Sequence, residues 1–234
     1  FQKMEASWAE QRGYLRTAIE ALGESPLVAQ ANAAIAATLP TPPTTSGMQT
    51  VPNGSTRLST SQFEIGFDAS TGAINHLSEH GRKATWATPQ HPLALFRYQS
   101  FSQTDYDRYY REYVQKDEAI AWWAIPDFLK PGIEESDAQS GFWLPKLQNI
   151  HQAVDAAGTR IVLDLAGDPI AHRRFGCPRR ITVELKLPHT SPTLEITLQW
   201  FDKPACRLPE ALWYSFTPNV AEPERWKLDK MGDW

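Results

Sequence analysis

The stretch from Arg180 to Phe201 constrains the fold of this chain more than any other segment. Its first half alternates polar residues with four large apolar ones, Ile181, Val183, Leu185 and Leu187. Its second half repeats the alternation with Leu194, Ile196, Leu198 and Trp200. A period of two is typical of strands with one buried face. Pro188 and Pro192 cannot donate to a β-ladder, so the segment predicts two long antiparallel strands joined by a turn.

Similar alternation elsewhere indicates that the chain is mainly β. Phe63 to Phe67 and Ala73 to Leu77 flank a turn at Asp68 to Gly72, which predicts a hairpin. Further strands are expected at Ala94 to Phe101, Gln148 to Asp155, Thr159 to Leu165 and Ala211 to Phe216. At about 1.5 to 3 kcal/mol per fully buried apolar side chain, these strands can anchor a sandwich core.

The first 39 residues instead predict a helical hairpin. Apolar residues recur at three- and four-residue spacing from Phe1 to Leu22, and Gly23 suits a left-handed C-cap. Ser25 is a candidate N-cap for a second, Ala-rich helix that runs from Pro26 to Leu39. Because the chain opens in mid-helix, we expect it to be part of a longer protein.

Residues 40–61 are rich in Pro, Thr and Ser, which predicts a linker or a strap over the surface. The expected organisation is therefore a helical segment at 1–39, a linker at 40–61 and a β domain at 62–234.

Charge and hydropathy exclude several classes of partner. A net charge of -4 and a pI near 5.9 argue against a nucleic-acid or anionic-membrane surface. No apolar run approaches the roughly 20 residues that span a bilayer, and no signal-peptide pattern is visible. We expect a soluble chain and make no prediction of its compartment.

The sequence carries no motif for metal-centred or covalent catalysis. His76 and His80 are four residues apart, but a hairpin is expected there, and such a pair binds metal only on a helix. Cys177 and Cys206 lack metal-ligand spacing, and a disulfide between them is the less favoured alternative. We therefore expect no catalytic residue, metal or cofactor in this chain.

Aromatic residues interleaved with polar ones indicate carbohydrate binding instead. The apolar face of a pyranose ring stacks on aromatic rings, and its hydroxyls need planar polar partners. One candidate group is Trp122, Trp123 and Asp127, of which at most one tryptophan can be exposed if the pair lies on a strand.

A second candidate is a tyrosine stripe. Tyr106, Tyr109, Tyr110 and Tyr113 fall on one face of a helix predicted from Gln103 to Val114. Packing against the sheet is the preferred interpretation of the stripe, and contact of Tyr106 with a sugar is the alternative.

The third candidate group is Lys203, Arg207 and Glu210. Trp200 is expected on the buried face at the end of its strand, and Pro204 and Pro209 predict two bends that gather the three charges at one rim. The preferred interpretation is a solvated rim with an ion pair between Arg207 and Glu210. The alternative is a hydrogen-bonding edge that faces a sugar or a neighbouring domain.

Several segments resemble one family. They are FEIGFDASTGAINHL, LALFRYQSFSQTDYDRYYREYV, PDFLKPG, DKPACRLPEALWYSF and WKLDKMGDW, and together they are similar to the C-terminal half of the α-mannosidases of glycoside hydrolase family 38. The resemblance implies the end of a helical bundle followed by an antiparallel β supersandwich of the galactose-mutarotase type. It places the zinc and the catalytic aspartate in a barrel domain, whose motifs match no position here. Zinc is thus implied only for that missing domain.

Three functions stay open at this point. The favoured one is an accessory, carbohydrate-binding and structural region that packs on the catalytic barrel of an α-mannosidase-like protein. The others are a stand-alone carbohydrate-binding module and a sugar mutarotase or epimerase, for which Glu210 and His172 are imaginable partners. Glycan binding by the isolated chain would favour the module, and accelerated anomer interconversion the epimerase.

Overall fold

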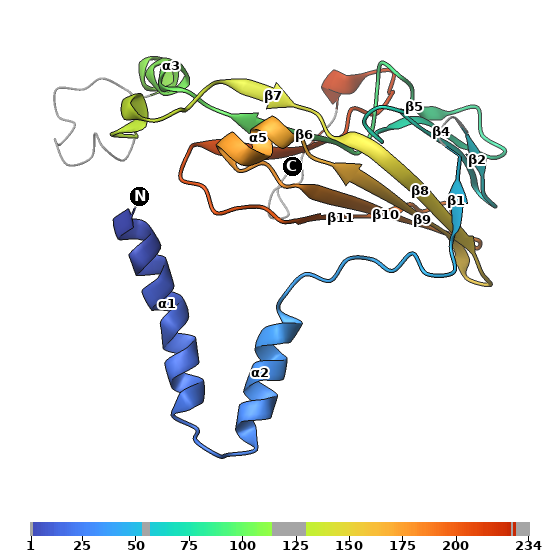
Figure 1. Cartoon of the computed structure of the whole chain (residues 1–234). Helices are drawn as coiled ribbons and strands as arrows, with labels where there is room; N and C mark the ends of the chain where they lie inside the picture. Colours follow the sequence, from blue (N-terminus) through green and yellow to red (C-terminus); the bar gives the residue numbers. More distant parts are fainter. Residues whose placement is uncertain (1, 53–56, 114–129, 226, 228–234) are drawn as a thin grey trace. The chain divides into compact units, whose positions relative to one another are not determined.

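The computed structural model describes residues 2–52, 57–113, 130–225 and 227. The chain divides into two compact units, Phe1–Pro42 and Pro43–Trp234. The first unit is helical, and the second carries the strands (Figure 1). The fold is mainly β, as the alternating segments predicted.

The helical unit is the predicted hairpin of α1 (Gln2–Glu20) and α2 (Leu27–Ala37). Gly23 has φ +58°, the left-handed conformation expected of a residue that ends a helix. The prediction of Ser25 as N-cap is wrong by one residue: α2 begins at Leu27, and its N-cap position is Pro26, which makes no side-chain cap hydrogen bond. Ser25 lies just before the cap, where its Oγ accepts from the Leu27 N–H at 3.3 Å. No side chain described in residues 6–42 is buried, and none of the described helices is long and apolar enough to cross a bilayer.

The central hairpin lies in a five-stranded antiparallel sheet. The strands, in spatial order, are β1 (Gln49–Val51), β8 (Lys146–Val154), β9 (Gly158–Ala166), β10 (Arg180–Pro188) and β11 (Glu195–Phe201). Val183 pairs with Leu198 and Ile181 with Trp200, in the register of a simple hairpin. The prediction for Arg180 to Phe201 is confirmed.

Burial differs between the two strands of this hairpin. The four apolar residues of β10 are at most 3% exposed, because β9 and β11 flank β10 on both sides. β11 is an edge strand, and its apolar side chains are only partly buried. The expectation that Trp200 is buried is wrong: it shares a face with Ile181, but its side chain is 44% exposed.

The described part of the unit also contains two smaller antiparallel sheets. The first contains β2 (Leu58–Ser59), β3 (Phe63–Phe67), β4 (Ile74–Glu79) and β5 (Thr85–Ala87). The second has the order β12 (Glu210–Ser215), β6 (Leu95–Ser100) and β7 (Gly141–Trp143). All three sheets contribute to one hydrophobic core.

The turn between β3 and β4 ties the first small sheet to the large one. Asp68 Oδ1 accepts hydrogen bonds from the N–H groups of Ser70 and Thr71, at 3.1 and 2.7 Å. Gly72 has φ +75°, and a Cβ at this position would lie 2.6 Å from a methyl group of Leu165 on β9. Only glycine therefore allows this close approach.

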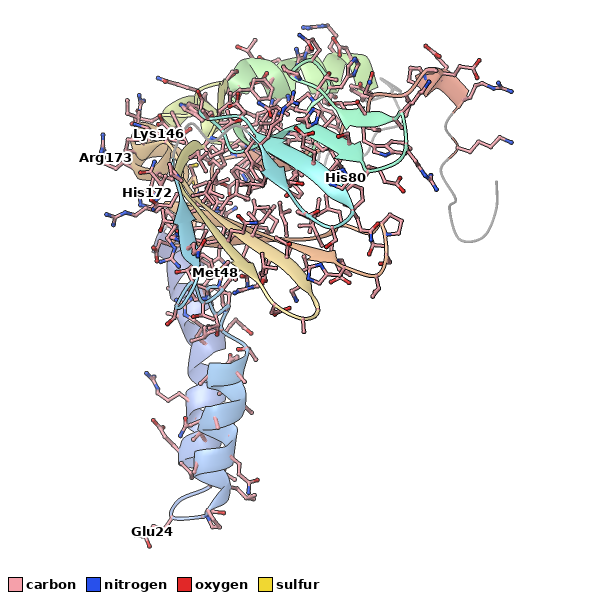
Figure 2. The ribbon with its side chains drawn as sticks, turned by 90° about the vertical axis from the view of Figure 1, so that its right-hand side faces the viewer. Glu24, Met48, His80, Lys146, His172 and Arg173 are labelled. Carbon is pink, nitrogen blue, oxygen red and sulfur yellow. The ribbon has the colours of Figure 1, made fainter. Side chains whose placement is uncertain are left out.

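The segment at 40–61 is more structured than the predicted linker. Its residues form β1, which pairs with β8, and β2, which pairs with β3. The Arg160 side chain on β9 donates to Thr44 O at 2.8 Å and lies 3.4 Å from Sδ of Met48, the residue labelled in Figure 2. Composition concealed these strands because each has only two or three residues.

In the described part of the β unit, the strands are interrupted by the helices α3 (Gln103–Tyr113) and α5 (Pro169–Phe175) and by 3-10 turns at Ile133–Glu135 and Pro223–Arg225. α3 was predicted and α5 was not. Asp168 caps α5 by accepting from the N–H groups of Ile170 and Ala171, both at 2.8 Å. Gly176 ends α5 with φ +92°.

Candidate functional site

The candidate site is built on α3, which begins directly after β6. The Asp105 carboxylate binds back to Ser102 at the start of the helix. Asp105 N donates to Ser102 O at 3.2 Å, and the Asp105 carboxylate accepts from Ser102 N at 2.8 Å. Ser140, just before β7, also donates to this carboxylate. The start of α3 is thus bound to the strand that follows the insertion.

These hydrogen bonds determine the charge of Asp105. Burial acts to raise its pKa, but the hydrogen bonds from Ser140 and Ser102, together with the Arg108 guanidinium, outweigh burial and hold the pKa of Asp105 below its usual value. Asp105 is therefore ionised at neutral pH. A negative charge in the first turn also interacts favourably with the helix dipole.

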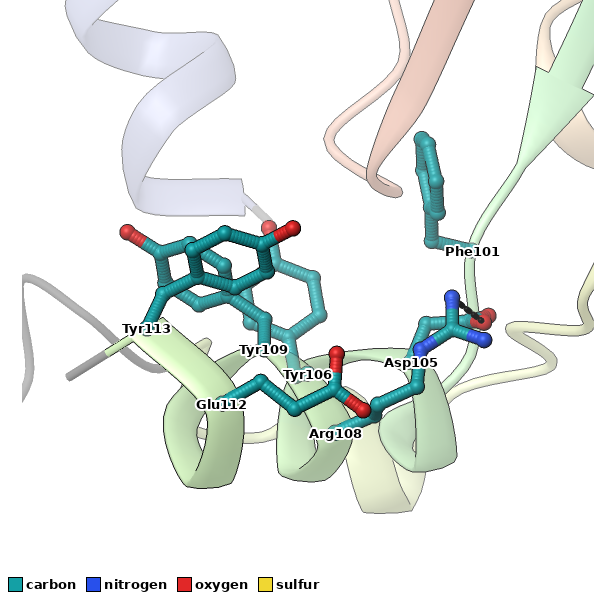
Figure 3. Close-up of a pocket in the computed structure, with 7 residues that line it drawn as sticks. All are labelled: Phe101, Asp105, Tyr106, Arg108, Tyr109, Glu112 and Tyr113. Carbon is teal, nitrogen blue, oxygen red and sulfur yellow. Dashed lines mark ion pairs between the residues drawn. The ribbon is translucent and has the colours of Figure 1, made fainter.

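A pocket of about 670 Å³ lies along α3 (Figure 3). Its lining is Phe101, Asp105, Tyr106, Arg108, Tyr109, Glu112 and Tyr113. The rings of Tyr109 and Tyr113 stack at 5.7 Å with an interplanar angle of 24°. Tyr109 is 43% exposed and Tyr113 is 76% exposed. Packing against the sheet, the preferred interpretation of the stripe, therefore does not account for these two rings.

Charged groups stand among these rings. Arg108 Nη2 lies 3.6 Å from Asp105 Oδ1, and Glu112 follows on the next turn of the helix. Burial, reinforced by Tyr109, raises the pKa of Tyr106, so its hydroxyl keeps its proton at neutral pH. The pocket thus offers apolar faces for stacking, a fork of guanidinium donors, and carboxylate acceptors.

The predicted rim is assembled in part. Lys203 Nζ lies 2.5 Å from Glu210 Oε1, and the Tyr98 hydroxyl lies 2.8 Å from Glu210 Oε2. The same hydroxyl is also within hydrogen-bonding distance of the carbonyl of Phe175 on α5. The expected ion pair between Arg207 and Glu210 is wrong, because Lys203 occupies that place. Arg207 forms no ion pair with any described residue.

An aromatic cluster backs this rim. The ring of Trp143 lies 5.9 Å from that of Tyr98 and 5.1 Å from that of Phe175. Both cysteines are near the rim and both are free, so the disulfide that was considered is absent. Burial raises the pKa of Cys177 to about 12, which leaves its thiol unreactive at neutral pH.

The remaining sequence candidates are distributed as follows. Trp122, Trp123 and Asp127 lie outside the described residues. His172 Nδ1 lies 2.7 Å from the Cys177 carbonyl, and no described hydrogen bond joins His172 to Glu210. His80 interacts with a backbone carbonyl, and the described residues contain no group of three His, Cys, Asp or Glu that could hold a metal ion.

A smaller polar hollow of about 470 Å³ lies on the four-stranded sheet. It is lined by Arg57, Asn75, His76, Thr88, Pro89 and Gln90. Burial and then Arg57 lower the pKa of His76 against the opposing effect of Glu64, so the imidazole is neutral at pH 7. Among the described residues no aromatic ring lines the hollow, which makes it a weaker candidate for sugar binding than the pocket on α3.

Of the residues that line the α3 pocket, sequence reasoning selected only Tyr106 as a candidate contact. It missed Phe101, Asp105, Arg108 and Glu112. One signal was available: Ser102 followed three residues later by Asp105 is a helix-capping pattern, and it marks the point where the chain leaves the sheet.

Residues 1–195 match a family described as "Domain of unknown function (DUF5054)". The chain belongs to this family. The matched region of the DUF5054 domain includes the helical unit, α3 with its pocket, and the central sheet as far as the start of β11. No curated protein and no solved structure matches the chain.

Proposed function

We propose that this DUF5054 chain is a carbohydrate-binding and structural region of an α-mannosidase-like protein, and that the α3 pocket is where it meets the sugar. The observation that carries the proposal is the pair of stacked, exposed tyrosines, Tyr109 and Tyr113, beside the ion pair of Asp105 and Arg108. Two exposed aromatic rings next to fixed polar groups are an arrangement that suits a pyranose ring.

The geometry favours a neutral polyol over a charged ligand. Asp105 and Arg108 already compensate each other, and Glu112 adds one negative charge to the lining. Vicinal hydroxyls can donate to the carboxylates and accept from the guanidinium without displacing the ion pair. The capping of α3 by Ser102 and Ser140 fixes the position of the site before binding, which lowers the entropy lost on association.

The proposed role within a glycosidase-like protein rests on the resemblance to glycoside hydrolase family 38. Three antiparallel sheets around one core, preceded by a helical hairpin, support a supersandwich of the galactose-mutarotase type. In this proposal the chain packs on a catalytic barrel, and zinc belongs to the barrel. The chain supplies binding and support, and the barrel supplies the catalytic residues.

A titration of the chain with methyl α-mannoside and α-mannobiose tests the binding site, with calorimetry or NMR as the readout. We expect binding with a Kd of about 1 mM, or about -4 kcal/mol. Tyr109→Ala should weaken binding at least tenfold, because the stacking surface is lost. Tyr14→Ala removes another exposed tyrosine, on α1, and is the matched control, for which no change is expected.

The proposal fails if neither sugar binds or if Tyr109→Ala and Tyr14→Ala behave alike.

A stand-alone binding module is the second candidate, since the exposed tyrosine pair would serve it equally well. Pull-down of the chain by a separately produced barrel domain supports the accessory role, whereas sugar binding without such association supports the module.

A further inference from the structure

The outer face of the three-stranded sheet carries a second cluster of aromatic and polar side chains. Along β6, Phe96, Tyr98 and Ser100 point into the core and are at most 2% exposed. Arg97 and Gln99 alternate with them and lie on the opposite face. This outer face is separate from the pocket on α3.

Two exposed aromatic residues flank β6 on that face. Trp213 on β12 pairs with Arg97, and Phe142 on β7 pairs with Gln99. Trp213 is 46% exposed and Phe142 is 62% exposed. With neighbouring strands about 4.8 Å apart and a rise of about 3.4 Å per residue, the Cα atoms of Trp213 and Phe142 are roughly 12 Å apart. That separation suits two linked sugar rings better than one.

The polar groups between the two rings are held in place. Trp213 Nε1 donates to Gln99 Oε1 at 2.8 Å, which directs the Gln99 carbonyl towards the indole and leaves its amide nitrogen to donate elsewhere. Arg97 Nη2 donates to Ser215 Oγ at 3.0 Å. Both interactions orient donors on the face without using all of them.

Arg97 is the decisive residue because its charge has no counter-ion in the described part of the chain. Among the three strands the only other charged residue is Glu210, which points to the core side and binds Lys203 and Tyr98. Arg97 Nε is buried and has no hydrogen-bond partner. A partly buried guanidinium without a carboxylate is unfavourable unless something else compensates it.

We propose that this outer face binds an acidic oligosaccharide, with Trp213 and Phe142 stacking on successive rings and Arg97 binding a ring carboxylate. The anion supplies the missing counter-ion, and Gln99 donates to a neighbouring hydroxyl. Arginine suits this role because the two Nη groups of its planar guanidinium can bind a carboxylate through two parallel hydrogen bonds while Nε stays buried. The inference does not rest on the α3 pocket, since it uses other residues and a ligand of different charge.

Calorimetric titration of the chain with trigalacturonic acid and with its neutral methyl ester tests the proposal, because both ligands have the same sugar rings and linkages and the ester lacks the carboxylate charges. We expect the acid to bind at least tenfold more tightly than the ester. Arg97→Gln should remove that preference, and Arg97→Lys should restore part of it because the charge returns without the fork. Trp213→Ala should weaken both ligands, whereas Trp200→Ala, an equally exposed tryptophan on β11, should change neither.

Several results would overturn the assignment: no binding of the acid, equal binding of acid and ester, or an Arg97→Gln protein with unaltered preference. Weakening of binding by Trp200→Ala to the same extent as by Trp213→Ala would also count against it. If Arg97→Gln does not fold, Phe142→Ala and Arg97→Lys test the proposal in its place, because Phe142 is too exposed to be needed for folding. Tyr109→Ala should leave binding of the acid unchanged, which separates failure here from failure of the α3 site.

Discussion

Glu210→Gln tests whether the ion pair with Lys203 holds the rim of the β unit together. The side chains of Lys203 and Glu210 are 20% and 18% exposed, so the pair is largely removed from water. Glu210 also accepts from Tyr98, whose hydroxyl reaches the carbonyl of Phe175. One carboxylate therefore links β12, β6, α5 and the loop after β11.

The expected magnitude follows from this partial burial. Removing one partner of a fully buried pair costs about 3 to 5 kcal/mol, and an exposed pair contributes about 0 to 1 kcal/mol. With about one fifth of each side chain exposed, we expect Glu210→Gln to lower the free energy of unfolding by about 2 to 3 kcal/mol. Lys203→Met should cost less, because Tyr98 still donates to the carboxylate. The double variant should be less destabilised than the sum of the two, because it leaves no uncompensated charge.

Urea unfolding followed by tryptophan fluorescence measures these differences, with an unchanged slope showing that the folded state is retained. Glu222→Gln is the matched control, since Glu222 pairs with Arg225 at 2.6 Å but with side chains 60% and 78% exposed. It should change stability by less than about 0.5 kcal/mol. A Glu210→Gln protein as stable as this control would refute the claim that burial gives the Lys203 pair its strength.

Three further predictions follow from the geometry. Gly176→Ala should destabilise the β unit by more than about 2 kcal/mol in urea unfolding, because φ is +92° and the new Cβ would lie 2.7 Å from Cys206 Cβ. Gly81→Ala is the control: its φ is +79° but the space around it is open, so it should cost about 1 kcal/mol. The pKa of Asp105 in the folded chain is below its usual value of 3.8, so ionised Asp105 stabilises the fold fully above that pH. This stabilisation is lost as pH falls through the lower folded-state pKa. Circular dichroism should therefore show no loss specific to α3 above pH 4. If the rim faces a sugar or a neighbouring domain, Arg207→Ala in the full-length protein should lower sugar affinity or activity at least tenfold, about 1.4 kcal/mol, with an unchanged melting temperature. Unaltered binding and turnover would show that Arg207 belongs to a solvated rim.

The β10 strand shows what periodicity alone can predict. Its apolar residues are all buried, because a central strand has a neighbour on each side and the alternation fixes which face is covered. Trp200 has the same pattern, yet it is largely exposed at the end of an edge strand. Alternation identifies the face of a strand but not its place in the sheet, and burial depends on both.

α5 was missed although its end signals are complete. Asp168, Pro169 and Gly176 are the N-cap, first-turn proline and left-handed terminus of a helix. With seven residues it is too short to display a helical period, so only the caps could have revealed it. The longer α3 differs, because its periodicity identifies the tyrosine stripe, whereas only the capping pattern at Ser102 points to the role of Asp105.

At the rim, the sequence predicted that Lys203, Arg207 and Glu210 lie together but assigned the wrong cation to Glu210. Arg207 and Glu210 are three residues apart, and proximity in sequence favoured pairing them. In the folded chain Asp202 has φ +54°, a left-handed turn directly after β11, and Lys203 lies seven positions from the carboxylate that it binds. The backbone reversal at Asp202 therefore selects Lys203 for Glu210. Arg207 has no such partner among the described residues, which makes it the rim cation available to an external ligand or domain.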